Sequence, residues 1–267
     1  DLTNTIFFTC DGTLMRGSFI MFFIIKKRSI SIFFTGILFI GLSAGAYNLA
    51  LHPAMKDWVE QKVVINKIDT DRKIVALTFD DGPELKNTAV LLDILKKHNA
   101  KATFFLMGAK AEKYPMLVKR IAAEGHEIGN HSYSHPDFNK KNKEAIINEI
   151  TKTDEIIYKL TGQKPYLFRP PGGYLSYALV DYTKQNNLTI AYWTYQQDSK
   201  DWRTGVKASR IASHIVKHIQ PGQIIILHDG CPNGLETAKA MDILIPKLRS
   251  EGYEFVTMSE LIKSGNK

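Results

Sequence analysis

Two adjacent aspartates and two histidines spaced four apart are the side chains of this sequence best suited to chemistry. Asp80 and Asp81 end an apolar run before a Gly-Pro turn, and His131 and His135 follow further along the chain. Successive side chains at a strand end point in opposite directions, so one aspartate can bind a metal while the other accepts a proton. Histidines four apart on a helical turn can reach one cation. One carboxylate and two imidazoles leave coordination positions open, as in a catalytic zinc site.

Each part of this pattern also has a purely structural interpretation. Asp-Asp-Gly-Pro is favourable turn chemistry and, taken alone, is more typical of a strand exit than of a metal site. A second histidine pair, His214 and His218, has the same spacing, but Ile211, Ile215 and Ile219 form the apolar stripe of that predicted helix. The pair falls beside the stripe, so we interpret it as part of a solvated helix face.

The region that must position these side chains alternates between strand and helix patterns. Such alternation indicates a parallel β/α barrel or a doubly wound sheet. In a barrel, the carboxyl ends of the strands converge on one rim, where active sites are found. The predicted strands cover residues 74–79, 102–107, 127–129, 166–168, 189–193, 224–227 and 254–256, and the predicted helices cover 88–98, 116–124, 142–160, 175–186, 208–219 and 235–250.

Four further polar residues come just after predicted strands. Arg169, Asp198, Asp201 and His228 would meet the metal residues at the rim of a barrel. A surface guanidinium is the alternative for Arg169, and a turn or helix cap is the alternative for Asp201. The alternative for His228 is weaker, because a titratable ring that closes an apolar strand is costly unless it has a role.

The composition is that of a globular protein with a moderate basic charge. The 267 residues leave room for one large domain and an appendage, with 44% hydrophobic residues, 23% charged residues and a formal net charge of +8. Lysines are scattered, and no basic stripe interleaved with aromatics is present, which argues against a nucleic-acid partner. Two cysteines, Cys10 and Cys231, exclude a disulfide framework and a cysteine-rich zinc motif.

The amino-terminal region has the pattern of an exported protein. Residues 30–51 are uncharged and long enough to span a bilayer, which needs about 20 residues, and Lys26, Lys27 and Arg28 precede them. We expect a transmembrane helix with residues 1–29 in the cytoplasm or upstream of the mature start. A signal peptide cleaved near Ala46 is the alternative. Residues 52–70 are interpreted as a juxtamembrane spacer with a short strand at 62–65, and residues 71–267 as the main domain.

Five ordered motifs in the main domain resemble those of a known family. They are TFDDG at 78–82, HSYSH at 131–135, FRPP at 168–171, DSKDW at 198–202 and ILH at 226–228. Together they resemble the polysaccharide deacetylases, carbohydrate esterase family 4, which contain the NodB homology domain. The resemblance extends from residue 74 to about residue 262 and implies a distorted (β/α) barrel. It also implies hydrolysis of an N-acetyl group on an amino-sugar polymer.

The resemblance assigns a metal site and a base. Asp81, His131 and His135 would hold a divalent ion, with Zn²⁺ expected and Co²⁺, Mn²⁺ or Ni²⁺ as alternatives. Asp80 would be the base that activates water, and Arg169 would pair with Asp80 and keep it ionised.

The resemblance also assigns an acid and the walls of the substrate site. His228 would protonate the leaving amine, and Asp201 would orient His228 or tune its charge. Trp202 and Leu227 would line an apolar slot for the acetyl methyl group.

One departure from the family pattern concerns the residue after Arg-Pro-Pro. The family often has tyrosine there, and its backbone N–H helps to bind the oxyanion. Gly172 fills that place in this chain, so we expect the N–H of Gly172 to keep this role and Tyr174 to compensate for the missing ring. Asp81 also fits an enzyme acting on N-acetylglucosamine, since relatives that act on muramic residues tend to have asparagine there.

We therefore expect an exported, metal-dependent deacetylase of N-acetylglucosamine in peptidoglycan. A chitooligosaccharide deacetylase and an acetyl xylan esterase are the alternative enzymes. A non-catalytic, membrane-tethered wall-binding module is the alternative of another class. The expected partners are a polysaccharide and the bacterial membrane, contacted through residues 30–51, and we expect the protein to be a monomer.

Overall fold

The computed structural model describes residues 55–265 of the chain. The segment 30–51, where we expect a transmembrane or signal helix, lies outside the described residues. Within residues 55–265, no helix is both long enough and apolar enough to cross a bilayer.

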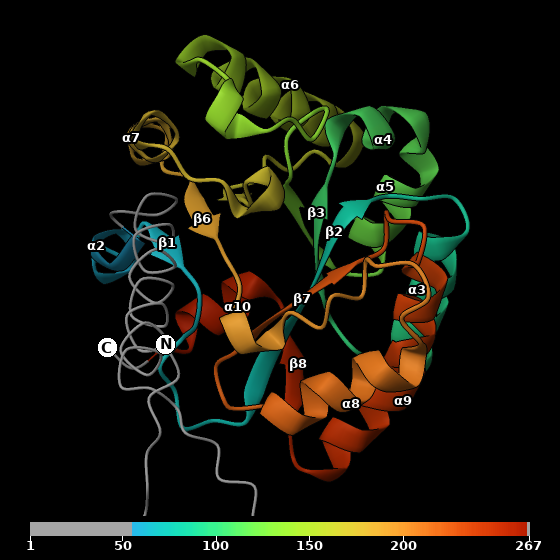
Figure 1. Cartoon of the computed structure of the whole chain (residues 1–267). Coiled ribbons are helices and arrows are strands. Elements are labelled where there is room, and N and C mark those ends of the chain that lie inside the picture. Colours follow the sequence, from blue (N-terminus) through green and yellow to red (C-terminus); the bar gives the residue numbers. More distant parts are fainter. Residues whose placement is uncertain (1–54, 266–267) are drawn as a thin grey trace, which may run out of the picture. The chain divides into compact units, whose positions relative to one another are not determined.

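The strands of the described region form one parallel sheet that curves into an open half-barrel (Figure 1). They are β1 (Val64–Ile65), β2 (Ile74–Gly82), β3 (Thr103–Leu106), β4 (Glu127–Asn130), β5 (Leu167–Phe168), β6 (Thr189–Ala191), β7 (Ile224–His228) and β8 (Glu254–Val256). Neighbouring strands follow the order β1-β6-β5-β4-β3-β2-β7, and β8 pairs with the beginning of β2. No ladder within residues 55–265 joins β7 back to β1, so the predicted barrel is open on that side.

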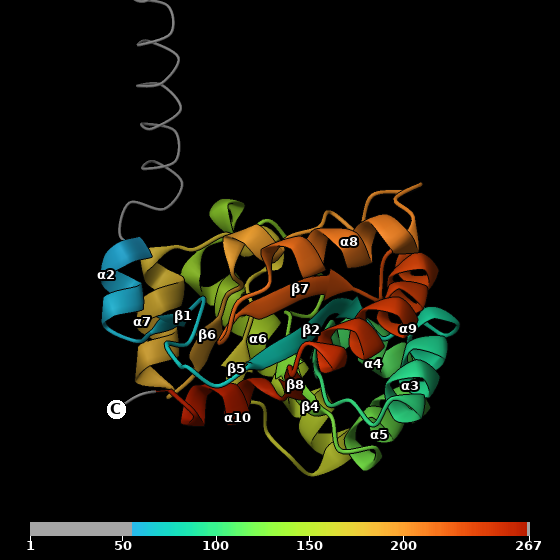
Figure 2. The same ribbon diagram turned by 90° about the horizontal axis from the view of Figure 1, so that it is seen from below.

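Helices cover the outer face of the strands, as the view from below shows (Figure 2). They are α2 (Met55–Glu60), α3 (Asn87–Lys97), α4 (Gly108–Lys113), α5 (Pro115–Ala123), α6 (Lys143–Thr161), α7 (Tyr177–Gln185), α8 (Ala208–His218), α9 (Gly234–Ser250) and α10 (Met258–Lys263), with short 3₁₀ turns η1 (Phe138–Lys140), η2 (Pro171–Gly173) and η3 (Tyr195–Gln197). The strands and helices predicted above are all present, with ends that differ by at most two residues except at β2, which extends three residues further than predicted.

The central strand β2 shows how burial positions the site. Leu77 and Phe79 are fully buried in the core between the sheet and its covering helices. Ala76 belongs to a separate apolar cluster inside the half-barrel. Side chains alternate along a strand, so Thr78 and Asp80 also face the interior. A carboxylate is thereby fixed inside the half-barrel at the carboxyl end of its central strand.

Part of the range 52–70, interpreted above as a spacer, is folded onto the sheet. Val64 of β1 pairs with Ile190 of β6, and Trp58 of α2 is only 5% exposed. Trp58 packs with residues of α6 and α7 in one apolar cluster. The sheet therefore begins before residue 71, because β1 adds one more strand beyond β6.

Three short helices, α2, α4 and α10, are absent from the sequence prediction. α10 has a readable signal, because Thr257 accepts a hydrogen bond from the Glu260 N–H while the Glu260 side chain accepts one from the Thr257 N–H. This reciprocal capping box is a known start signal for a helix. α4 begins at Gly108 without a side-chain cap, so no comparable signal precedes it.

Candidate active site

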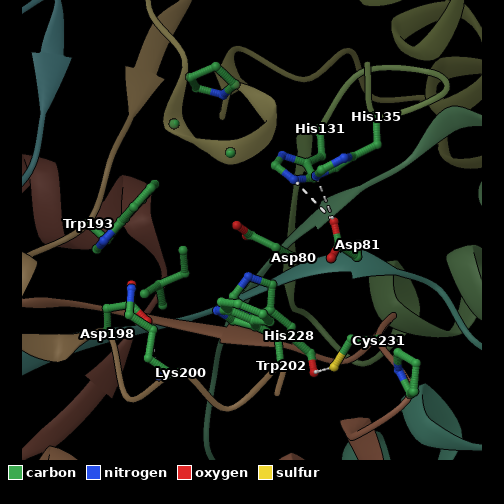
Figure 3. A pocket seen from close by; sticks show the side chains of 15 residues that line it. Asp80, Asp81, His131, His135, Trp193, Asp198, Lys200, Trp202, His228 and Cys231 are labelled. Carbon is green, nitrogen blue, oxygen red and sulfur yellow. Dashed lines mark hydrogen bonds and ion pairs between the residues drawn. The ribbon is translucent and has the colours of Figure 1, made fainter. Parts of the chain in front are cut away.

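A pocket with a volume of about 460 Å³ lies at the carboxyl ends of the strands and contains most of the predicted site residues (Figure 3). It is open to solvent and combines carboxylates, imidazoles and aromatic rings. Its lining consists of Asp80, Asp81, His131, His135, Pro170, Gly172, Gly173, Trp193, Asp198, Lys200, Trp202, Ile226, His228, Cys231 and Pro232.

A bulge at the end of β2 turns Asp81 into the pocket. Strict alternation would point Asp81 away from the side that Asp80 faces, as the sequence analysis assumed. The pairing of β2 with β3 instead shifts register between Asp80 and Gly82, and Asp81 has a left-handed backbone with φ of 67°. Bulges of this kind re-aim side chains next to active sites. Both carboxylates therefore line the same pocket.

His131 and His135 converge on Asp81 from a loop, and not from the helical turn that their spacing suggested (Figure 3). The Nε2 atoms of both rings lie 3.3 Å from Oδ1 of Asp81. Ser132 and His135 have left-handed backbones, with φ of 66° and 56°. The Nδ1–H of His131 donates to the backbone oxygen of Arg169 at 2.8 Å, which leaves the lone pair of Nε2 facing the pocket.

Side chains from outside the pocket hold the loop between the two histidines. Oε2 of Glu149, on α6, accepts hydrogen bonds from the N–H groups of Tyr133 and Ser134 at 2.9 and 2.7 Å. Asn130 accepts from the Ser132 N–H at 2.8 Å. No local sequence pattern marks Glu149, because the contact depends on how α6 packs against the loop.

The electrostatics of the three residues suit a cation. Oδ1 of Asp81 is buried and has no hydrogen-bond donor in the described region, although two ring nitrogens lie close to it. Burial raises the pKa of Asp81, but the contact with His131 and the charges of His131, His228 and His135 outweigh it and hold this pKa well below its usual range. Burial also lowers the pKa of His135. A carboxylate oxygen and two imidazole nitrogens fit a divalent metal with nitrogen and oxygen ligands.

Asp80 is fixed by a fully buried guanidinium. Nη1 of Arg169 donates to Oδ1 of Asp80 at 2.8 Å, and both side chains are almost completely buried. Three further hydrogen bonds from Arg169 go to Thr78 and to the backbone oxygens of Ala191 and Tyr192. Arg169 is therefore no surface residue, which was the structural alternative for it.

His228 and Asp201 form a second buried pair on the other side of the pocket. Nδ1–H of His228 donates to Oδ1 of Asp201 at 2.9 Å, and its backbone N–H donates to Oδ2 at 2.7 Å. Thr237 adds a third hydrogen bond to Asp201 at 2.8 Å. Burial lowers the pKa of His228, but the charge and hydrogen bond of Asp201 outweigh it and raise this pKa to about 9. Asp201 thus keeps His228 protonated near neutral pH.

The structure corrects one predicted pocket residue. Leu227 is fully buried in the core on the helix side of β7, where it packs with Phe79. Its neighbour Ile226 points to the other face and lines the pocket together with Trp202, which is 42% exposed. The two-residue alternation of β7 explains the difference, because Ile226 shares a face with His228. The same alternation could have identified Ile226 from the sequence.

Gly172 lies in the wall of the pocket, whereas Tyr174 lies outside the pocket. Gly172 lines the pocket and has φ of 62°, a left-handed conformation that favours glycine. Tyr174 is absent from the pocket lining, and its ring lies against Gly172, where it would be 2.7 Å from an added Cβ. Tyr174 therefore supports the turn from outside the pocket. Trp193, absent from the predicted site, contributes an aromatic wall.

Comparison with known proteins identifies relatives of this arrangement. The family model described as polysaccharide deacetylase matches residues 67–191. A peptidoglycan-N-acetylglucosamine deacetylase of Bacillus cereus is 41% identical over 208 residues, which cover 78% of this chain and 74% of that protein.

Solved structures are similar in fold as well as in sequence. The crystal structure of the Bc1960 peptidoglycan N-acetylglucosamine deacetylase is 40% identical with a TM-score of 0.74, and the match covers 79% of this chain and 97% of that one. A family 4 acetyl xylan esterase from Clostridium thermocellum, in complex with a cobalt ion, is 38% identical with a TM-score of 0.65. That match covers 72% of this chain and 91% of the esterase.

Replacement of one histidine tests the metal site. We expect His135→Ala to lose most of its bound divalent metal, because the change removes one of three protein ligands. The other two ligands stay in place, and they are too few to hold the ion tightly. Metal content after dialysis, measured by inductively coupled plasma mass spectrometry, gives the result directly. His98→Ala is the control, since His98 pairs with Asp242 at the end of α3, away from the pocket. Equal metal content in His135→Ala and the parent would disprove the assignment.

Proposed function

We propose that this chain, which belongs to the polysaccharide deacetylase family, removes acetyl groups from N-acetylglucosamine units of peptidoglycan. It is a hydrolase of amide bonds, as its relatives are. The observation that carries the proposal is the joint presence of Asp80, the Asp81–His131–His135 group and His228 in one pocket. Amide hydrolysis needs a base, an electrophile and an acid, and these residues can supply all three roles.

The proposed metal is Zn²⁺, held by Asp81, His131 and His135. Two imidazoles, one carboxylate and open positions are typical of catalytic zinc, although Co²⁺ suits the same ligands. When bound, such an ion lowers the pKa of water and polarises a carbonyl. The hydrogen bond from His131 to the backbone oxygen of Arg169 orients the ring for this task.

Asp80 is the proposed general base. Its carboxylate lines the pocket beside Asp81 and is held by Arg169 at 2.8 Å. Held in this way, the carboxylate is placed to accept the proton of the attacking water. Because Arg169 is anchored by three strands or their ends, the carboxylate is preorganised and need not reorient.

His228 is the proposed general acid. Its Nδ1–H is donated to Asp201, so its Nε2–H is free to protonate the leaving nitrogen. Protonation is required because an amide anion is a very poor leaving group. The N–H of Gly172 is the proposed oxyanion donor. Trp202 and Ile226 are proposed as walls for the acetyl methyl group, which replaces the earlier assignment of Leu227.

Two alternative substrates and one non-catalytic alternative can be compared with this function. The similarity to an acetyl xylan esterase supports acetylated xylan as a competing substrate, and chitin oligosaccharides offer the same acetamide. A non-catalytic wall-binding module is disfavoured, because loss of any one of Asp80, Asp81 or His228 would suffice to inactivate the site and all three are in place.

Asp80→Asn tests the reaction and its base together. We expect the parent to lower the mass of purified peptidoglycan fragments by one acetyl group per reacted sugar. Asp80→Asn should be slower by about 10²–10⁴-fold, the usual contribution of a general base, and should still bind metal. Mass spectrometry of the fragments measures both rates.

Side-by-side assays on chitin oligosaccharides and acetylated xylan provide the substrate control. Faster turnover of either polymer than of peptidoglycan fragments would favour that alternative. A parent inactive on all three would support the binding-module alternative.

Asp201→Asn tests the acid through pH dependence. The raised pKa of His228, about 9, depends on the charge of Asp201, whereas burial lowers this pKa. With Asp201 neutral, the largest contribution that raises the pKa of His228 is lost and only the smaller ones of Asp80 and Asp81 remain, so this pKa falls and the protonated acid is lost at a lower pH. The alkaline limb of the kcat/KM profile should therefore move to lower pH. An alkaline limb that stays in place would exclude His228 as the titrating acid.

The proposed location of the catalytic domain is outside the cytoplasm, with residues 30–51 as a membrane anchor. The basic residues at positions 26–28 precede the apolar run and favour this orientation. A periplasmic or extracellular reporter fused after Lys267 should be active, and a cytoplasmic one should be silent. The reverse result would contradict the topology, and a size shift on immunoblots would indicate cleavage near Ala46.

A further inference from the structure

A second hollow adjoins the active-site pocket on the side away from His131 and His135. Its volume is about 210 Å³. It shares Asp198 and Lys200 with the active-site pocket, so these two residues form the border between the hollows. Figure 3 shows them across the pocket from the metal ligands. The remaining lining comes from Tyr195, Gln196, His214 and His218.

Tyr195 is presented to solvent by a rigid turn. Tyr195 is 86% exposed, although the short turn η3 that carries it is flanked by buried Thr194 and ends at buried Gln197. Thr194 bonds to the backbone oxygen of Asn66 and accepts from the N–H of Ile224. Gln197 is fully buried and donates to Gln223 at 2.6 Å. The backbone that carries Tyr195 is therefore held in place by buried hydrogen bonds on both sides. The exposed ring offers a preformed apolar face to a ligand.

The two histidines, so far without a role, face this hollow with acceptors available. Nε2 of His214 contacts the backbone oxygen of Gln196 at 2.9 Å, and Nδ1 of His218 contacts the backbone oxygen of His214 at 2.8 Å. A carbonyl accepts only, so these ring nitrogens must carry the protons. In the neutral rings, Nδ1 of His214 and Nε2 of His218 are then left as acceptors for hydroxyl donors.

The border between the hollows supplies both signs of charge. Nζ of Lys200 lies 2.5 Å from Oδ2 of Asp198, and the Lys200 N–H donates to Oδ1 of the same residue. Asp198 also forms a parallel bridge with Ile226 of the active-site wall. The loop is thus tied to the same strand that ends in His228, which fixes the second hollow relative to the first.

We propose that this second hollow binds the sugar next to the one being deacetylated. An apolar ring face, two hydroxyl acceptors and a lysine–aspartate pair match the C–H face and hydroxyl rim of a pyranose. The inference rests on the proposed polysaccharide substrate, because a chain in the active-site pocket must leave it across one of its borders. The role assigned to His214 and His218 by the sequence pattern, a solvated helix face, is extended accordingly.

Dependence on chain length tests this subsite. With the full chain and N-acetylglucosamine oligomers of increasing length, Tyr195→Ala should raise KM about fivefold for long oligomers, the scale of one aromatic contact. It should leave kcat and the KM of the shortest substrate nearly unchanged. Tyr195→Phe keeps the ring and should behave as the parent. Tyr158→Ala, which removes another exposed tyrosine on α6, is the matched control.

Binding to a slow variant separates this inference from the proposed function. Calorimetry with Asp80→Asn, alone and combined with Tyr195→Ala, measures the affinity for long oligomers without turnover. A fivefold loss of affinity confined to long oligomers supports the subsite. Equal affinities with and without Tyr195, or an equal loss for all lengths, would overturn it. A parent that binds oligomers but deacetylates none would instead count against the proposed function.

Discussion

The site depends on one buried ion pair between Arg169 and Asp80. Removing two charges from water costs several kcal/mol per ion, which only a well-paired and fully hydrogen-bonded arrangement repays. Arg169 meets this condition with Asp80, Thr78 and two backbone oxygens, and its guanidinium also lies 4.1 Å from the ring centroid of Phe105. The same contacts link the end of β2 to the segments around β5 and β6. The hydrogen bonds that orient the proposed base therefore also align these strand ends.

The proposed metal ligands are positioned by backbone conformations that L-residues seldom adopt. Asp81, Ser132 and His135 all have positive φ, at a cost of about 1–3 kcal/mol each by general experience with such residues. The bulge of β2 and the hydrogen bonds of the histidine loop hold these conformations. The bulge and the hydrogen bonds together bring side chains close to one another, whereas regular strand or helix geometry would keep these side chains apart.

Much of the site could be predicted because its chemistry is concentrated in residues that follow strands. Asp80, Asp81, Arg169 and His228 could be grouped by the convergence of strand ends alone. Other features depend on tertiary packing: the bulge at Asp81, the open side of the half-barrel and the hydrogen bonds of Glu149 have no local signal. The assignment of Leu227 in place of Ile226 is different, because side-chain alternation along β7 already predicts that Ile226 shares a face with His228.

The hydrogen bonds of Glu149 have a consequence for how the protein can change over time. Glu149 binds the N–H groups of Tyr133 and Ser134, and every residue except proline has an N–H to offer. These backbone contacts can therefore survive substitution at positions 133 and 134, although a change at 134 would also remove the hydrogen bond from the Ser134 hydroxyl to Oε1 of Glu149. Substitution of Glu149 would remove these hydrogen bonds, so the shape of the loop depends on a residue of α6 outside the loop.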